Sequence, residues 1–143
     1  MSILDYSKRL LSIAETLSRW AGAIAALDRS RRAKVAKYAD AIAETLGRAA
    51  RFSGRLMADP TDKAAARGVA REFGRITGYL ETLVGVLQHH LDGRKLAGVK
   101  RRLRQLCPAG TDGLAAGAAP SIRTDRLLAA EGYFRALADS LRA

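Results

Sequence analysis

Residues 3–27 read ILDYSKRLLSIAETLSRWAGAIAAL, and their apolar side chains recur in alternating steps of three and four. This spacing places those side chains on one narrow stripe of an α-helix. The members of the stripe are Ile3, Tyr6, Leu10, Ile13, Leu17, Trp20, Ile24 and Leu27. A helix of this length is not stable alone in water, so the stripe needs a second helical surface to cover it. We therefore predict a first helix over residues 2–27 that packs against other helices.

The same spacing continues in the middle of the chain and predicts two more long helices. The second begins at the capping segment 28–30 and ends near Met57, where its apolar stripe stops. Asp59 and Pro60 then form a start signal, because a carboxylate caps free amide groups and proline suits the first helical position. The third helix is expected over residues 60–91.

The C-terminal third of the chain predicts two shorter helices around a linker. A fourth helix carries Leu96, Val99, Leu103 and Leu106 at helical spacing. Residues 107–120 are rich in Gly and Ala, as expected of a linker, and residues 121–142 form a last helix. The chain is thus predicted to be all-α. We expect a single domain, 1–143, built as an antiparallel helical bundle of three long helices plus two shorter C-terminal helices, with its core over 2–106.

Length and cysteine content narrow the class of protein. A chain of 143 residues can bury a sufficient core without metals or disulfides. Its only cysteine, Cys107, excludes an internal disulfide framework and cysteine-rich zinc modules, and fits a reducing compartment. The sequence has no apolar run long enough to span a bilayer, and the acidic Asp5 near its start is unlike a secretory signal. We therefore expect a cytoplasmic protein that does not act on membranes.

Residues with catalytic or metal-binding chemistry are few and poorly spaced. His89 and His90 are adjacent, so on a helix they point about 100° apart and do not chelate one metal together. Gly110, Gly113 and Gly117 follow no predicted strand and lack the Lys-Ser/Thr ending of a phosphate-binding loop. We therefore predict no catalytic, cofactor-binding or metal site, and no enzyme activity.

Positive charge is the second strong feature, with a formal net charge of +11 from 25 basic and 14 acidic residues. Basic residues cluster without any acid over residues 94–104 and again at the start of the second helix. The candidate polyanion-binding residues are Arg94, Lys95, Lys100, Arg101, Arg102, Arg104, Arg31, Arg32 and Lys34. Such clusters attract nucleic acid phosphates. A GC-rich genome favours arginine codons and would produce the same excess of positive charge. Polyanion binding and genome composition therefore both stay open as explanations of the charge.

Two further rows of arginines occur on single helical faces. Their members are Arg48, Arg51 and Arg55, and Arg67, Arg71 and Arg75. These rows are expected either to be solvated faces or to converge in space as a stripe for phosphates. Sequence-specific readout is not implied. Exposed aromatic residues that stack on single-stranded bases are not expected either, because the few aromatic residues, Trp20 among them, mostly fall on or beside the predicted buried stripes.

Two segments carry a family resemblance. They are RAKVAKYADAIAETL at residues 32–46 and TGYLETLVGVL at residues 77–87. Over residues 3–106 the chain resembles small helical, effector-associated or adaptor-like modules at the N-terminus of bacterial STAND-type signal-transduction NTPases and of conflict systems. The resemblance implies a module that couples partners through helical surfaces, with no catalytic residues to carry over.

Two functions follow as expectations. The first is a non-enzymatic adaptor in bacterial defence or signalling, which binds a protein partner or itself through its helices. The alternative is a basic helical subunit of a nucleoprotein complex, which holds the RNA or DNA backbone through an Arg/Lys stripe. A helical bundle that acts on membranes ranks behind both.

Overall fold

The computed structural model describes residues 3–91, 93–106 and 120–142, and within them it contains six α-helices and no strand. The helices are α1 (Ile3–Arg19), α2 (Ala21–Ala25), α3 (Arg29–Ala58), α4 (Lys63–Leu87), α5 (Gly93–Leu106) and α6 (Pro120–Arg142). The all-α prediction is confirmed. None of the described helices combines the length and the apolar character needed to cross a bilayer.

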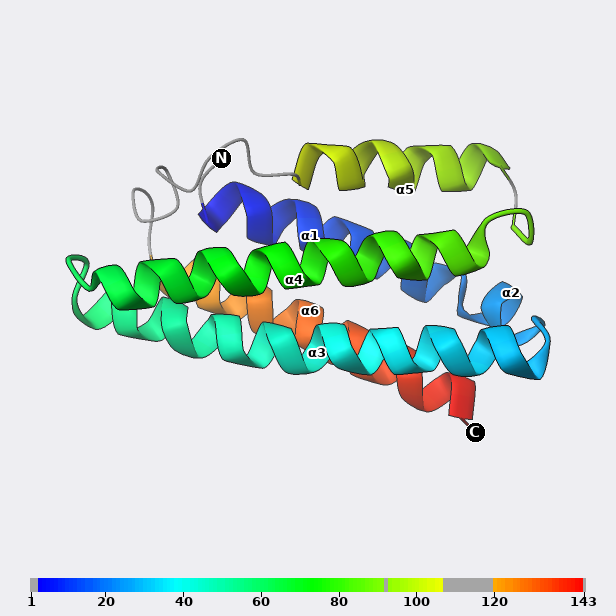
Figure 1. The fold of residues 1–143 in the computed structure, drawn as a ribbon, viewed down its shortest axis with the longest axis horizontal. Coiled ribbons are helices and arrows are strands. Elements are labelled where there is room, and N and C mark those ends of the chain that lie inside the picture. The colour runs from blue at the N-terminus through cyan, green and yellow to red at the C-terminus, as the bar shows by residue number, and fades with distance from the viewer. Residues whose placement is uncertain (1–2, 92, 107–119, 143) are drawn as a thin grey trace.

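The helices form an elongated bundle in which α3 packs between α4 and α6 (Figure 1). Helix α1 packs on α6, and α5 lies across the other side of the bundle, on α1 and α4. Helices α1, α4 and α6 run in one direction and α3 and α5 in the other. The helices do not divide into three long and two short ones, because α6 has 23 residues against 17 in α1.

The predicted apolar stripes form one buried cluster that includes side chains from all six helices. Tyr6, Leu10, Ile13 and Leu17 of α1 are fully buried. The stripe of α5 is buried too, since Leu96, Val99, Leu103 and Leu106 are at most 6% exposed. Burial of these side chains stabilises the bundle and leaves the polar residues of each helix outside.

The first predicted helix is divided at Trp20, so its continuous course over residues 2–27 is wrong. Trp20 leaves helical geometry as the N-cap of α2, and its amide donates to the Leu17 carbonyl at 3.0 Å. Both pieces keep the same apolar stripe, with Ile24 fully buried beyond the break. Spacing alone therefore did not reveal the break. Trp20 itself is only partly buried.

The turn between α3 and α4 uses a different capping residue from the predicted one. Asp62 caps α4 by accepting from the Ala65 amide at 3.0 Å, and this bond lowers the pKa of the Asp62 carboxyl. Asp59 instead accepts from the amide and hydroxyl of Thr61, at 3.0 and 2.6 Å. Because this local turn occupies the Asp59 carboxylate, Pro60 lies in the turn and not at the first helical position.

The end of α4 also differs from the prediction, since the helix stops at Leu87 and not at residue 91. His89 has a φ of 71°, a left-handed conformation that glycine favours and other residues rarely adopt. The chain turns there and enters α5. Of the predicted linker 107–120, residues 107–119 lie outside the described part of the chain, and Pro120 begins α6.

Candidate polyanion-binding surface

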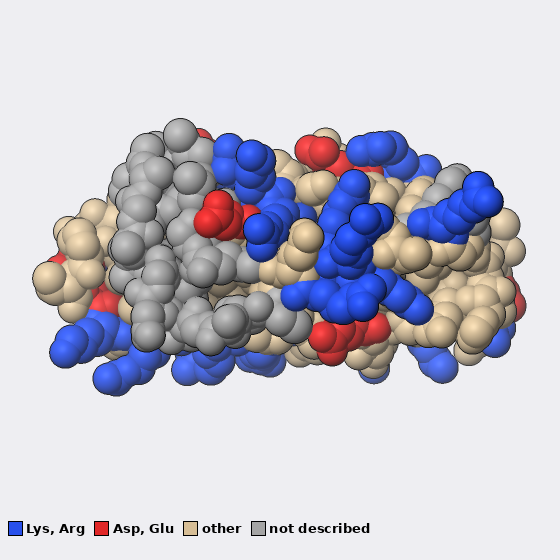
Figure 2. All heavy atoms as spheres, turned by 90° about the horizontal axis from the view of Figure 1, so that it is seen from above, with Lys and Arg blue, Asp and Glu red and all other residues tan. Residues whose placement is uncertain are grey.

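Helix α5 carries the strongest charge cluster of the described chain. Its sequence, GRKLAGVKRRLRQL, contains six cations and no acid. Because its apolar stripe faces α1 and α4, its basic residues lie at the flanks and on top of the helix. Figure 2 looks down on this face and shows Lys and Arg side chains gathered across its middle. The side chain of Lys95 lies outside the described atoms.

Two hydrogen bonds to α1 fix the position of α5. The Arg102 guanidinium donates to the Thr16 hydroxyl at 2.9 Å, and the Arg9 guanidinium donates to the Gln105 carbonyl at 2.9 Å. The second bond places a cation at the C-terminus of α5, where the helix dipole favours it. The basic helix is thus held on the bundle by apolar packing and by these bonds, in which Lys100, Arg101 and Arg104 take no part.

The cations of α5 border a groove on its α4 side. This groove, of about 380 Å³, is lined by Glu81, Val84, Gly85, Gln88, Lys100, Leu103 and Arg104. Within the part of the chain that the structure describes, Lys100, Arg101 and Arg104 form no ion pair. No ion pair within the described ranges therefore neutralises their charge, and the one acidic residue that lines the groove is Glu81.

The second predicted group lies elsewhere and has local roles. Arg31 pairs with Asp28 at 2.6 Å, and hydrogen bonds from Arg31 lower the pKa of the Asp28 carboxyl. Arg32 donates to the Ala25 carbonyl at 3.2 Å, at the end of α2. These residues belong to the start of α3, which packs on α4 and α6, whereas α5 packs on α1 and α4. Arg31, Arg32 and the exposed Lys34 are therefore not brought together with the α5 cluster.

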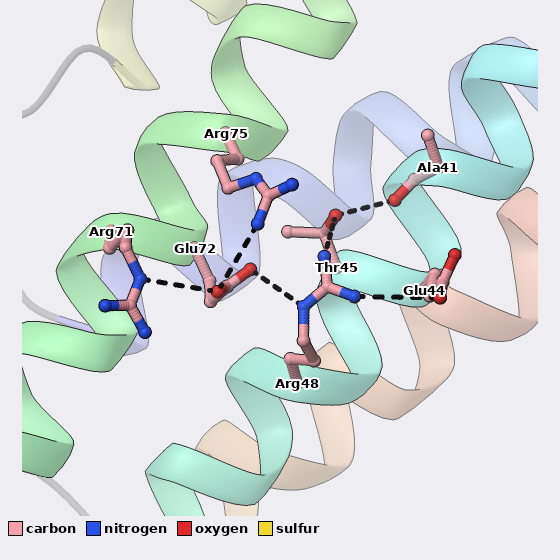
Figure 3. Close-up of polar contacts among 7 residues, drawn as sticks. All are labelled: Ala41, Glu44, Thr45, Arg48, Arg71, Glu72 and Arg75. Carbon is pink, nitrogen blue, oxygen red and sulfur yellow. Dashed lines mark hydrogen bonds and ion pairs between the residues drawn. The ribbon is translucent and has the colours of Figure 1, made fainter.

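One arginine of the α3 row and two of the α4 row meet at one buried carboxylate, as Figure 3 shows, while Arg55 pairs with Asp62 instead. Glu72, whose side chain is 3% exposed, pairs with Arg48 at 3.2 Å, Arg71 at 3.7 Å and Arg75 at 4.0 Å. Arg48 also lies 3.7 Å from Glu44. A hydrogen bond to Tyr79, and then the charge of Glu72, raise the pKa of Arg75. This face is therefore a network of internal ion pairs, and its arginines are partly neutralised.

Phe52 of α3 adds an aromatic contact beside this network. The guanidinium groups of Arg55 and Arg71 lie 5.7 and 5.9 Å from the centre of its ring. Gly68 of α4 faces the same ring, and a Cβ at residue 68 would lie 2.7 Å from ring atoms of Phe52. The absence of a side chain at Gly68 thus permits the close approach of α3 and α4.

We expect Gly68→Ala to destabilise the protein by about 1–3 kcal/mol despite its better helix propensity, because the methyl group overpacks against the Phe52 ring. Chemical denaturation measures this change. Gly74→Ala is the matched control, since a Cβ there meets nothing within 4 Å, and it should not destabilise. The effect of Gly68→Ala should shrink in a Phe52→Leu background. An equal loss in both backgrounds would mean that Phe52 is not the obstacle.

The two histidines occupy the turn after α4. His89 has the left-handed backbone described above, and both His89 and His90 are exposed. Among the described residues no three His, Cys, Asp or Glu side chains are grouped as metal ligands. Cys107 lies outside the described ranges.

Comparison of the chain with protein-family models, with curated proteins and with solved structures finds no match.

Proposed function

We propose that this protein is a non-enzymatic helical module that binds the phosphate backbone of RNA or DNA through α5. We call the surface formed by its described cations the α5 basic face; its members are Arg94, Lys100, Arg101, Arg102 and Arg104. The observation that carries the proposal is the difference between this face and the other basic clusters. Arg48, Arg71 and Arg75 surround Glu72, Arg55 pairs with Asp62 and Arg31 pairs with Asp28, but no acid lies on α5.

The geometry of the α5 basic face suits a phosphate backbone. Helix α5 lies with its apolar side on α1 and α4, so its cations extend along one outer edge of the bundle. Arginine and lysine side chains contact phosphates without reading bases, and each contact releases counterions. We therefore expect binding that is independent of sequence and weakens steeply as salt rises.

The adaptor role predicted from the sequence is the second candidate. Among the described residues only Met57, Leu128 and Tyr133 are large apolar side chains with substantial exposure, and their exposed fractions are 46%, 49% and 39%. Two of them lie on α6, so a protein partner that docks by apolar contact would use that helix. Lys100, Arg101 and Arg104 form no ion pair among the described residues, whereas α6 exposes only two large apolar side chains there. For this reason we favour a polyanion.

A matched pair of variants tests the proposal. The α5 variant carries Lys100→Gln, Arg101→Gln and Arg104→Gln, and the control variant carries Arg51→Gln, Lys63→Gln and Arg67→Gln on α3 and α4. Each variant loses three positive charges, so the net charge falls from +11 to +8 in both. The control residues are exposed, as are Arg101 and Arg104, while Lys100 is partly buried.

We expect the α5 variant to bind mixed-sequence DNA and RNA about tenfold more weakly than the wild type at low salt, equally for every sequence. The control variant should lose much less affinity. Electrophoretic mobility shifts at low ionic strength measure both. Equal losses in the two variants would show that only net charge matters, and no retention of nucleic acid by the wild type would refute the function. Light scattering and pull-down of a protein partner would then test the adaptor role.

A further inference from the structure

A second groove lies on the α1 side of α5, and it combines cations with the only tryptophan of the chain. This α1–α5 groove, of about 340 Å³, is lined by Thr16, Arg19, Trp20, Arg94, Gly98, Val99 and Arg102. Its volume falls within the ~300–1,000 Å³ range of sites for small molecules. None of its lining residues is acidic.

The break between α1 and α2 brings Trp20 into this groove. A continuous helix would keep residue 20 in the apolar stripe, but Trp20 departs from helical geometry as the N-cap of α2. Its side chain packs against the core and is still partly exposed. A partly exposed indole can stack on a nucleobase, and this stacking does not depend on sequence.

Cations from two helices line the groove together with the indole. Arg19 comes from the end of α1, and Arg94 and Arg102 come from the α1-facing side of α5. Arg102 is oriented by its hydrogen bond to Thr16 and keeps further N–H donors on its planar guanidinium group. Gly98 lies between these two arginines in sequence, and a Cβ there would meet nothing within 4 Å. The groove is therefore open beside Gly98.

We propose that the α1–α5 groove holds one nucleotide unit of a single-stranded nucleic acid, with the base against Trp20 and a phosphate near Arg19, Arg94 and Arg102. This inference rests on the proposed function and adds strand preference to it. The bases of a duplex are stacked inside the helix and cannot reach Trp20, whereas the bases of a single strand can. The protein thus prefers single strands over duplexes.

Fluorescence of Trp20 reports directly on this groove, because the chain has no other tryptophan. The probes are a mixed-sequence 15-nucleotide DNA strand, the duplex of the same sequence, and inorganic polyphosphate, which has no bases. We expect the single strand to quench Trp20 emission strongly, and the duplex and polyphosphate to bind with little quenching. Equal quenching by polyphosphate would show an anion site without base stacking and would overturn the inference.

Two variants separate the groove from the α5 basic face. Trp20→Leu keeps an apolar side chain and should weaken single-strand binding about tenfold, with little effect on duplex binding. Tyr133→Leu on α6 is the matched control for loss of an exposed aromatic ring. Gly98→Leu fills the groove without removing charge, and its higher helix propensity favours folding. It should lower single-strand affinity and quenching together, while Gly132→Leu on α6 should change neither.

Fluorescence anisotropy of labelled strands distinguishes the two proposals. If single strands and duplexes bind equally, and neither Trp20→Leu nor Gly98→Leu changes affinity, the groove inference is wrong and the α5 basic face still stands. If neither strand form binds the wild type at low salt, the proposed function itself is wrong.

Discussion

We expect Tyr6→Ala to lower the free energy of unfolding by about 4 kcal/mol. Tyr6 is fully buried in α1, and its ring stacks on Phe73 of α4 with 3.8 Å between ring centres. Its hydroxyl donates to the Phe73 carbonyl at 2.9 Å and lies 3.0 Å from the Thr77 hydroxyl. The substitution therefore removes a stacked ring and leaves a cavity between α1 and α4.

Tyr6→Phe separates the two parts of this effect. It keeps the stacked ring and removes only the hydroxyl, so we expect a loss of about 1 kcal/mol. The Phe73 carbonyl retains a hydrogen bond from Thr77 at 3.0 Å, which limits the loss. Denaturant unfolding followed by circular dichroism measures both variants. A loss below about 1 kcal/mol for Tyr6→Ala would mean that α1 does not pack on α4 through this ring.

Glu72→Ala should be the second most damaging change, with a loss of about 3 kcal/mol. The carboxylate is 3% exposed and lies within 4.0 Å of guanidinium nitrogens from Arg48, Arg71 and Arg75. Its removal leaves three cations close together at the α3–α4 contact without their shared counter-charge. The neighbouring Glu44 lies 3.7 Å from Arg48 but is largely exposed, so it offsets little of the repulsion.

Three comparisons test this explanation. Glu72→Gln keeps the size and a hydrogen-bond acceptor for Arg48, so its loss should be about half as large. Glu44→Ala should cost less than about 1 kcal/mol, because the Glu44–Arg48 pair is solvent-exposed. Added salt should restore part of the stability of Glu72→Ala by screening the arginines. A loss that salt does not change would point to packing of the side chain and not to its charge.

The apolar spacing predicts most of the fold because helical packing depends on which side chains can be hidden together. Tyr6, Leu10, Ile13 and Leu17 form a stripe in the sequence and are fully buried in the structure. The spacing does not detect a break that leaves the stripe in register, and so the interruption at Trp20 was missed. It also does not decide between two acidic caps close in sequence, where Asp62 and not Asp59 begins α4.

The sequence predicts that the candidate site is positively charged. It does not predict which cations share one surface and which lie in ion pairs elsewhere. A run of six cations without acid identifies α5 directly. The role of Arg48, Arg71 and Arg75 depends on Glu72, which lies 24 residues from Arg48 in the chain. Sequence spacing carries no information on that contact between α3 and α4. The α1–α5 groove was missed for the same reason, since Trp20 and Arg94 are far apart in sequence.

The salt dependence of single-stranded DNA binding tests the central claim most directly. We predict that log K falls linearly with log salt concentration for the wild type, and that the slope is smaller by about 2 in the variant with Lys100→Gln, Arg101→Gln and Arg104→Gln. This difference corresponds to three lost phosphate contacts at roughly 0.7 each. The matched variant on α3 and α4 should keep the wild-type slope. Identical slopes in the wild type and the α5 variant would show that α5 does not contact the backbone, and would contradict the account.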